Sequence, residues 1–212
     1  MTRTARRLKQ DMAGIATIHR TRKVEIARSL ALSIPAVVKA RNLEPLDDRM
    51  KRIGESYLLS VEGVNLCLPA DCFGAAREMY ARRVYLASPL VQLPTNGWVL
   101  DCGANQGLFA LLAVGAGCKA LAIEAQSGFT PRRRELLALN EMPVDSMIHV
   151  EAMLGGTSGQ FTSDEEWKAS SHGGSAERPM TASISGLLSE HSIDEVAFLK
   201  MDIEGGDRKS VV

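Results

Sequence analysis

The sequence has no net charge, little cysteine and no grouping of metal ligands, and each of these absences excludes a class of partner or site. Lys and Arg number 25 against 25 Asp and Glu, so no global positive field draws the chain to nucleic acid. The four histidines are scattered without the spacing of a metal site, at His19, His149, His172 and His191. We therefore expect neither a metal site nor a nucleic-acid partner.

Cysteine occurs four times without a C-x-x-C spacing, which favours reduced thiols in a cytoplasmic protein. The apolar stretch LALSIPAVV, residues 30–38, contains Pro35 and is far below the roughly 20 residues of a membrane span, so we expect no integral membrane association. The first 30 residues hold eight Lys and Arg. A basic helical face toward anionic lipid remains an alternative there to a solvated helical extension.

The order of apolar segments along the chain predicts an α/β protein with an N-terminal extension. Residues 1–55 are expected to be helical and interrupted near Pro35, and two β runs around Glu62 and Gly63 predict a hairpin at 56–69. After Gly97, strands alternate with helices, which favours a parallel, Rossmann-like sheet. The strands are expected at 98–102, 119–124, 146–151 and 196–203, and the helices at 106–115, 131–140 and 184–191.

The stretch VLDCGANQGLFALL joins the first of these strands to its helix through a glycine turn. Gly103 and Gly107 form a G-x-x-x-G pattern, and Asn105 between them is a residue that tolerates positive φ. In an open parallel sheet, ligands bind beyond the carboxyl ends of the strands, where such a turn lets backbone N–H groups approach them. The turn is therefore a candidate ligand site.

Two acidic residues end adjacent strands beside this turn. Asp101 precedes the turn, where its charge would repel a pyrophosphate and suit a cationic cofactor. Glu124 ends the second strand, where a carboxylate can accept hydrogen bonds from the hydroxyls of a ribose. Asn105 also stands where the dinucleotide pattern G-x-G-x-x-G has its middle glycine, so a nicotinamide oxidoreductase is a less favoured alternative.

Three segments together resemble a known family: LDCGANQG at 100–107, AIEAQ at 122–126 and FLKMDIEGGD at 198–207. They are similar to the FkbM-type methyltransferases, which use S-adenosylmethionine on a Rossmann-like sheet. The resemblance covers about residues 56–207 and implies a strand order of 3-2-1-4. It implies methyl transfer to a hydroxyl oxygen of a sugar, lipid or polyketide-like small molecule.

The resemblance also assigns roles to residues. It implies that Asp101, Gly103, Asn105 and Gly107 surround the methionine part of S-adenosylmethionine and that Glu124 binds its ribose. This agrees with the charge of the cofactor, whose sulfonium is cationic.

Asp202 and Glu204, in the last of the three segments, are the candidate catalytic residues. We expect a carboxylate there to accept the proton of the acceptor hydroxyl.

The C-terminus differs from what the resemblance implies, because members of the family continue past the strand that contains Asp202. The last residues, DRKSVV, are what the DNA string GATCGGAAGAGCGTCGTG of common sequencing adapters encodes. We therefore expect three segments: a helical extension at 1–55, a partial methyltransferase domain at 56–206 and a non-native tail at 207–212. The fourth strand would then be an unpaired edge, and a marginally stable, inactive or non-catalytic fragment is the other alternative function.

Overall fold

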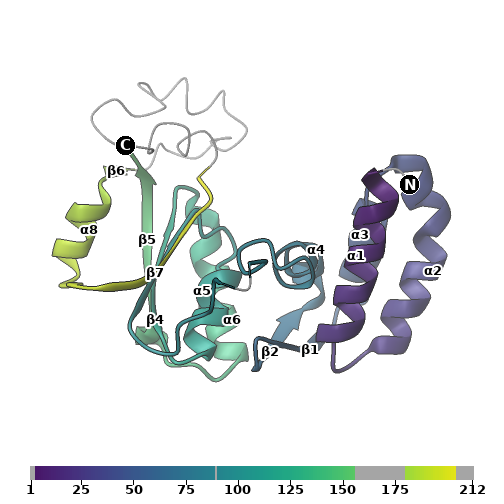
Figure 1. Ribbon diagram of the computed structural model, residues 1–212, viewed down its shortest axis with the longest axis horizontal. Helices are drawn as coiled ribbons and strands as arrows, with labels where there is room; N and C mark the ends of the chain where they lie inside the picture. Colours follow the sequence, from purple (N-terminus) through teal and green to yellow (C-terminus); the bar gives the residue numbers. More distant parts are fainter. Residues whose placement is uncertain (1–2, 89, 156–179, 204–212) are drawn as a thin grey trace. The chain divides into compact units, whose positions relative to one another are not determined.

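A computed structural model describes residues 3–88, 90–155 and 180–203 of the chain. The residue contacts divide the chain into two compact units, Met1–Gln92 and Leu93–Val212 (Figure 1). The predicted helical extension and the predicted hairpin both lie in the first unit.

The first unit begins with helices, as the sequence predicted, but the predicted interruption near Pro35 is absent. The long second helix continues through Pro35, which lies on its exposed side. There the Ala31 carbonyl, which loses its helical N–H partner, can bond to water. The elements of this unit are α1 (Arg3–Ile18), α2 (Lys23–Ala40), α3 (Glu44–Lys51), β1 (Ser56–Val61), β2 (Val64–Pro69), the short η1 (Ala70–Cys72), α4 (Phe73–Ala76) and the π-helical turn η2 (Arg77–Ala81).

The hairpin is confirmed, and its turn explains its register. β1 and β2 are antiparallel, with Val61 opposite Val64, so the loop is only two residues long. Glu62 and Gly63 have φ values of 49° and 82°, the positive pair that a twisted two-residue hairpin requires.

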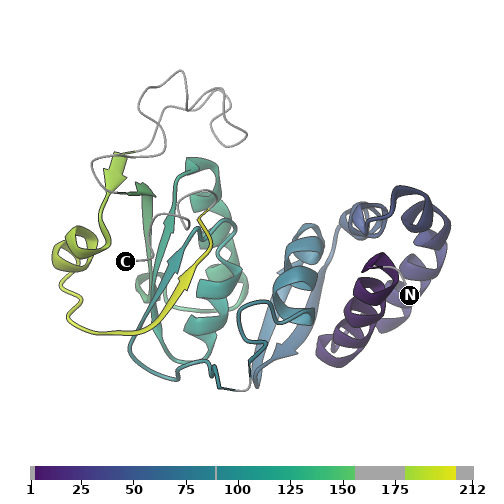
Figure 2. The same ribbon diagram turned by 45° about the horizontal axis from the view of Figure 1, so that its top comes forward.

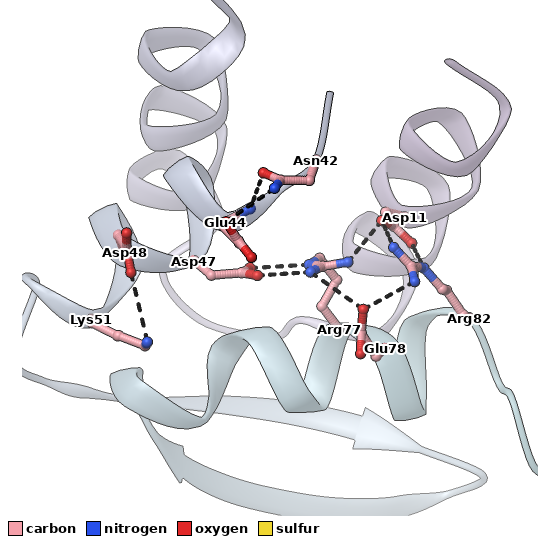
Figure 3. Close-up of polar contacts among 9 residues, drawn as sticks. All are labelled: Asp11, Asn42, Glu44, Asp47, Asp48, Lys51, Arg77, Glu78 and Arg82. Atoms are coloured by element: carbon pink, nitrogen blue, oxygen red, sulfur yellow. Dashed lines mark hydrogen bonds and ion pairs between the residues drawn. The ribbon is translucent and has the colours of Figure 1, made fainter. Parts of the chain in front are cut away.

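A buried ionic network joins the helices of the first unit (Figure 3). Arg77 on η2 donates to Asp11 on α1 at 2.9 Å and to Asp47 on α3 at 2.7 Å. Arg82 also binds Asp11, through two nitrogens, and pairs with Glu78 at 3.2 Å. Because the Arg77 side chain is only 4% exposed, removing Asp11 or Asp47 would leave a buried guanidinium with fewer hydrogen bonds.

The second unit contains a five-stranded parallel sheet of order β6-β5-β4-β3-β7, consistent with the predicted Rossmann-like fold. The predicted order 3-2-1-4 is not the observed one, because it leaves out β6 at the edge beside β5. This strand has only three residues, too few to show an alternating pattern. The strands are β3 (Trp98–Cys102), β4 (Lys119–Glu124), β5 (Met147–Leu154), β6 (Met180–Ala182) and β7 (Val196–Met201).

Helices cover both faces of this sheet (Figures 1 and 2). On one face, Leu187 of α8 packs in a core with Leu100 and Leu121 of the strands. Alternate strand residues such as Asp101 face the opposite side, where Asp101 reaches the backbone of α5. The helices of this unit are α5 (Leu108–Gly115), α6 (Thr130–Leu139) and α8 (Ile184–Glu190), with single turns at η3 (Ser127–Phe129) and η4 (Val144–Ser146).

The described residues test the predictions for the C-terminus and for membrane spans only in part. Within them, β7 pairs with β3 alone, while the predicted tail at 207–212 lies outside them. Within the same ranges, none of the helices combines the length and the apolar character needed to cross a bilayer.

Candidate functional site

The glycine turn, residues 103–107, lies at the carboxyl end of β3 and is tied to the neighbouring strand. The N–H groups of Gly103 and Ala104 both donate to the carbonyl of Ile123 on β4 at 2.9 Å. The φ values are 73° at Gly103, 49° at Asn105 and 78° at Gly107. Asn105 therefore has the positive φ that the sequence suggested it could adopt. The turn therefore has three residues in the left-handed region within five positions.

Both glycines of the turn are close to other parts of the second unit. A Cβ on Gly103 would overlap the carbonyl oxygen of Asp202, just after β7. A Cβ on Gly107 would lie 2.7 Å from Cγ of Arg133 on α6. Only glycine fits at these two points, so the turn is packed closely against backbone on one side and an arginine stem on the other.

Asp101 does not offer a free negative charge to a ligand. It is fully buried, and one carboxylate oxygen accepts a hydrogen bond from Ala110 N–H in α5 at 3.1 Å. Its other oxygen lies 2.8 Å from Nζ of Lys200, which is its register partner on β7. The same Nζ donates to the carbonyl of Gly103 at 2.7 Å, so the ammonium compensates the carboxylate and holds the first residue of the turn.

This pairing corrects the charge argument made from the sequence. A compensated carboxylate neither repels a pyrophosphate nor attracts a sulfonium strongly. The sequence reasoning overlooked Lys200, although a single lysine inside the apolar strand segment VAFLKM is a signal that it needs a buried partner.

Glu124 lies at the end of β4, where the sequence placed it, beside the turn. Its Oε2 accepts from Asn105 N–H at 2.8 Å and its Oε1 from Gln126 N–H at 3.0 Å. Each carboxylate oxygen can accept a second hydrogen bond. The structure thus brings Glu124 and the turn together, with acceptor capacity left for a ligand.

Arg133 holds the same residue of the turn from the other side. Its guanidinium is fully buried and donates to the carbonyl of Asn105 at 2.9 Å, to Thr130 Oγ1 at 2.9 Å and to His149 Nδ1 at 3.3 Å. Burial lowers the pKa of Arg133 from its usual value, while the charge of Glu124 opposes this change. The Asn105 peptide groups are therefore fixed by an acid at N–H and by an arginine at the carbonyl.

Sequence reasoning missed Arg133 because it is the middle residue of the run Arg132, Arg133 and Arg134. Nothing in that run distinguishes a buried arginine from its two neighbours, of which Arg134 is exposed. Only the packing of α6 against the turn identifies it.

Two polar atoms next to these residues lack a hydrogen-bond partner within the described ranges. Burial and the nearby Arg133 lower the pKa of His149 to about 4, so at neutral pH this histidine is uncharged. Because its Nδ1 accepts from Arg133, its Nε2 carries the proton, and this atom is buried without an acceptor. The amide oxygen of Gln106 in the turn is likewise buried without a donor. A bound ligand would satisfy such groups.

Of the two predicted catalytic residues, the structure describes one. Asp202 follows β7 directly, is exposed, and donates its N–H to the carbonyl of Cys102 at 2.9 Å, at the same end of the sheet as the turn. Glu204 lies outside the described residues. Among the residues that can be placed, no three His, Cys, Asp or Glu side chains are grouped as metal ligands would be.

The chain matches a known protein family. Residues 101–210, just over half of the chain, match the family described as the Methyltransferase FkbM domain. The matched range begins at Asp101 and includes every predicted site residue. No curated protein and no solved structure matches the chain. The resemblance proposed from the three sequence segments is confirmed.

Proposed function

Since this chain belongs to the FkbM methyltransferase family, we propose that it transfers a methyl group from S-adenosylmethionine to a hydroxyl oxygen of a small molecule. The acceptor class is a sugar, a lipid or a polyketide-like compound. The observation that supports this proposal most directly is the Asn105 backbone, fixed between Glu124 and Arg133 at the carboxyl end of the sheet.

The residues around the turn fit S-adenosylmethionine, which supplies a methyl group bonded to a cationic sulfur and ready for displacement. Gly103, Asn105 and Gly107 would lie against its methionine part, because the turn is fixed at the carboxyl end of the sheet, where ligands of this fold bind. Glu124 would bind the ribose hydroxyls through its remaining acceptor capacity. The buried Gln106 amide oxygen and His149 Nε2 add an acceptor and a donor for the same ligand.

Asp101 serves this site through the turn and not by direct charge. Asp101 and Lys200 neutralise each other beneath the turn, and the lysine fixes the Gly103 carbonyl. We therefore assign Asp101 and Lys200 to positioning the turn.

Asp202 is proposed to accept the proton of the acceptor hydroxyl. It lies at the strand end next to the turn and its side chain is exposed, so an acceptor molecule can reach it. Glu204, two residues later in the sequence, is the second candidate for this role. In methyl transfer the attacking oxygen, the methyl carbon and the leaving sulfur lie in one line. The main task of these residues is therefore to orient the hydroxyl.

Titration calorimetry with the full chain tests the proposal. We expect S-adenosylmethionine to bind, and Glu124→Ala to weaken binding by about tenfold or more, as for a lost hydrogen bond to a charged group. Glu135→Ala, an exposed acid on α6, is the matched control and should leave the affinity unchanged. Binding of NADH in place of S-adenosylmethionine would favour an oxidoreductase, and binding of neither would favour a non-catalytic fragment.

A further inference from the structure

The overall neutrality of the chain conceals a separation of charge. Residues 1–55 hold 13 Lys and Arg against six Asp and Glu, whereas residues 56–212 hold 12 against 19. A basic excess confined to one end of a sequence indicates an anionic partner for that part. The helices of the first unit are where this excess lies.

A groove between α2 and α3 gathers part of this charge. It has a volume of about 580 Å³, and its lining includes Arg28 from α2 together with Arg49 and Arg52 from α3 and its C-terminal end. Within the described residues, no ion pair involves any of these three arginines. Arg49 makes one hydrogen bond, to Ser33 Oγ at 3.2 Å.

The two acids in the groove are paired with cations that do not line it. Glu25 lies 3.5 Å from Arg22, and Asp48 lies 3.7 Å from Lys51, a pair drawn in Figure 3. With both acids counted, the lining still holds three arginines against two carboxylates, so the groove carries a net positive charge. A phosphate group is the natural complement of several converging guanidinium groups.

The outer side of α2, next to this groove, is apolar. Its inner side buries Ile26, Ser29, Ser33 and Val37, while Val24, Leu32 and Val38 are 80%, 54% and 66% exposed. The exposed side of α2 thus carries large aliphatic side chains where a solvated helix has polar ones. Leu32 also lines the groove, so the apolar side and the cationic groove are continuous.

The helical spacing mixes these aliphatic residues with basic ones. At 100° per residue, Arg28 and Lys39 lie between Val24 and Leu32 around the helix, on the side away from the buried serines. A helix with aliphatic residues flanked by Lys and Arg is typical of one that lies in the interface of an anionic membrane.

We propose that the α2–α3 surface docks on a membrane that contains anionic phospholipid. A lipid phosphate binds in the groove among Arg28, Arg49 and Arg52, and Val24, Leu32 and Val38 enter the boundary between headgroups and acyl chains. Nucleic acid fits less well, because α2 and α3 carry no aromatic residue on which a base could stack. This inference does not depend on the proposed methyl transfer.

Vesicle sedimentation of the full chain is the test. We expect the chain to bind phosphatidylcholine vesicles with about 30% phosphatidylserine and not vesicles of phosphatidylcholine alone, and to be released as salt rises. Replacing Arg28, Arg49 and Arg52 together by Gln should weaken binding at least about tenfold, since each basic residue near the surface contributes roughly fivefold. The control variant loses the same charge from the second unit, through Lys119→Gln, Arg132→Gln and Arg134→Gln. It should bind anionic vesicles as the original chain does.

A second pair of substitutions distinguishes binding to a membrane from binding to a soluble anion. Val24→Asn and Val38→Asn, both at exposed positions that should not disturb folding, should also weaken vesicle binding. Inorganic phosphate should not displace the protein from vesicles at concentrations that leave ionic strength nearly unchanged. The proposal would be overturned if phosphate displaced the protein from vesicles while the valine changes had no effect. It would also be overturned if the chain bound no vesicles or bound neutral and anionic vesicles equally. Tighter binding to a single-stranded oligonucleotide than to anionic vesicles would contradict it as well.

Discussion

Nζ of Lys200 lies 2.8 Å from Oδ1 of Asp101, and both side chains are almost completely buried beneath the glycine turn. The two residues are register partners on adjacent parallel strands, so the sheet itself holds them together. The lysine also binds the carbonyl of Gly103. One ion pair therefore connects β7, the strand that precedes Asp202, to the turn that is the candidate cofactor site.

Removing this lysine should destabilise the second unit. Lys200→Met would leave the carboxylate of Asp101 buried without a counter-charge, which typically costs about 3–5 kcal/mol. Urea unfolding followed by tryptophan fluorescence measures this, because Trp98 lies on β3 of the second unit. The exposed Arg134→Met is the control and should change stability little, and adding Asp101→Asn to Lys200→Met should restore part of the loss. Equal effects of Lys200→Met and Arg134→Met would contradict the buried pair.

Gly103 should not tolerate even a methyl group. Gly103→Ala would place Cβ against the carbonyl of Asp202 and would also strain a backbone with φ of 73°, so both stability and S-adenosylmethionine affinity should fall. Gly128→Ala is the matched control, because a Cβ there meets nothing within 4 Å and the backbone is not left-handed. The same urea unfolding experiment and a calorimetric titration compare the two. If the Gly103→Ala variant is as stable as the Gly128→Ala variant, the turn does not have this geometry.

Arg133 should not be replaceable by lysine. An ammonium cannot donate to Asn105, Thr130 and His149 in the fixed directions of a guanidinium, so Arg133→Lys should loosen the turn and weaken cofactor binding by about tenfold. Arg134→Lys, one residue away and exposed, should have no measurable effect on affinity. If the two variants bind S-adenosylmethionine equally, the assignment of Arg133 to the site is wrong.

Acid should destabilise the first unit through His19. Burial lowers the pKa of His19 to about 4, below the ordinary value of 6.5 that the unfolded chain would have. The unfolded state therefore binds the proton first as pH falls, and about 2–3 kcal/mol of stability is lost between pH 6.5 and pH 4. Circular dichroism of the helices during urea unfolding should show this loss. In the His19→Gln variant, the free energy of unfolding should fall less steeply with decreasing pH, whatever its value at pH 8. An unchanged slope in the variant would refute the role of His19.

Much of the fold could be predicted from the sequence because its signals are local. The hairpin follows from Glu62-Gly63 between two β runs, and the strand, turn and helix around Gly103 follow from the order of apolar and glycine residues. The three-residue β6 could not be predicted, because its strand state depends on pairing with β5. Pro35 misled the prediction because its effect on a helix depends on whether the freed carbonyl faces solvent.

The sequence predicted where the candidate site residues lie in the fold but not their electrostatics. Glycines and acids at strand ends locate the carboxyl edge of the sheet, and Glu124 lies beside the turn as expected. That Asp101 is neutralised depends on Lys200, 99 positions later in the sequence, through the pairing of two strands. Partners so distant are set by tertiary structure, which a single sequence does not display.

The central claim is that the glycine turn, with Glu124 beside it, binds S-adenosylmethionine. A crystal structure of the full chain grown with S-adenosylhomocysteine, the product that remains after methyl transfer, tests it most directly. We predict the ribose hydroxyls within hydrogen-bond distance of Glu124 and the amino-acid part against residues 103–107. Density for the ligand at any other place on the chain would contradict the claim.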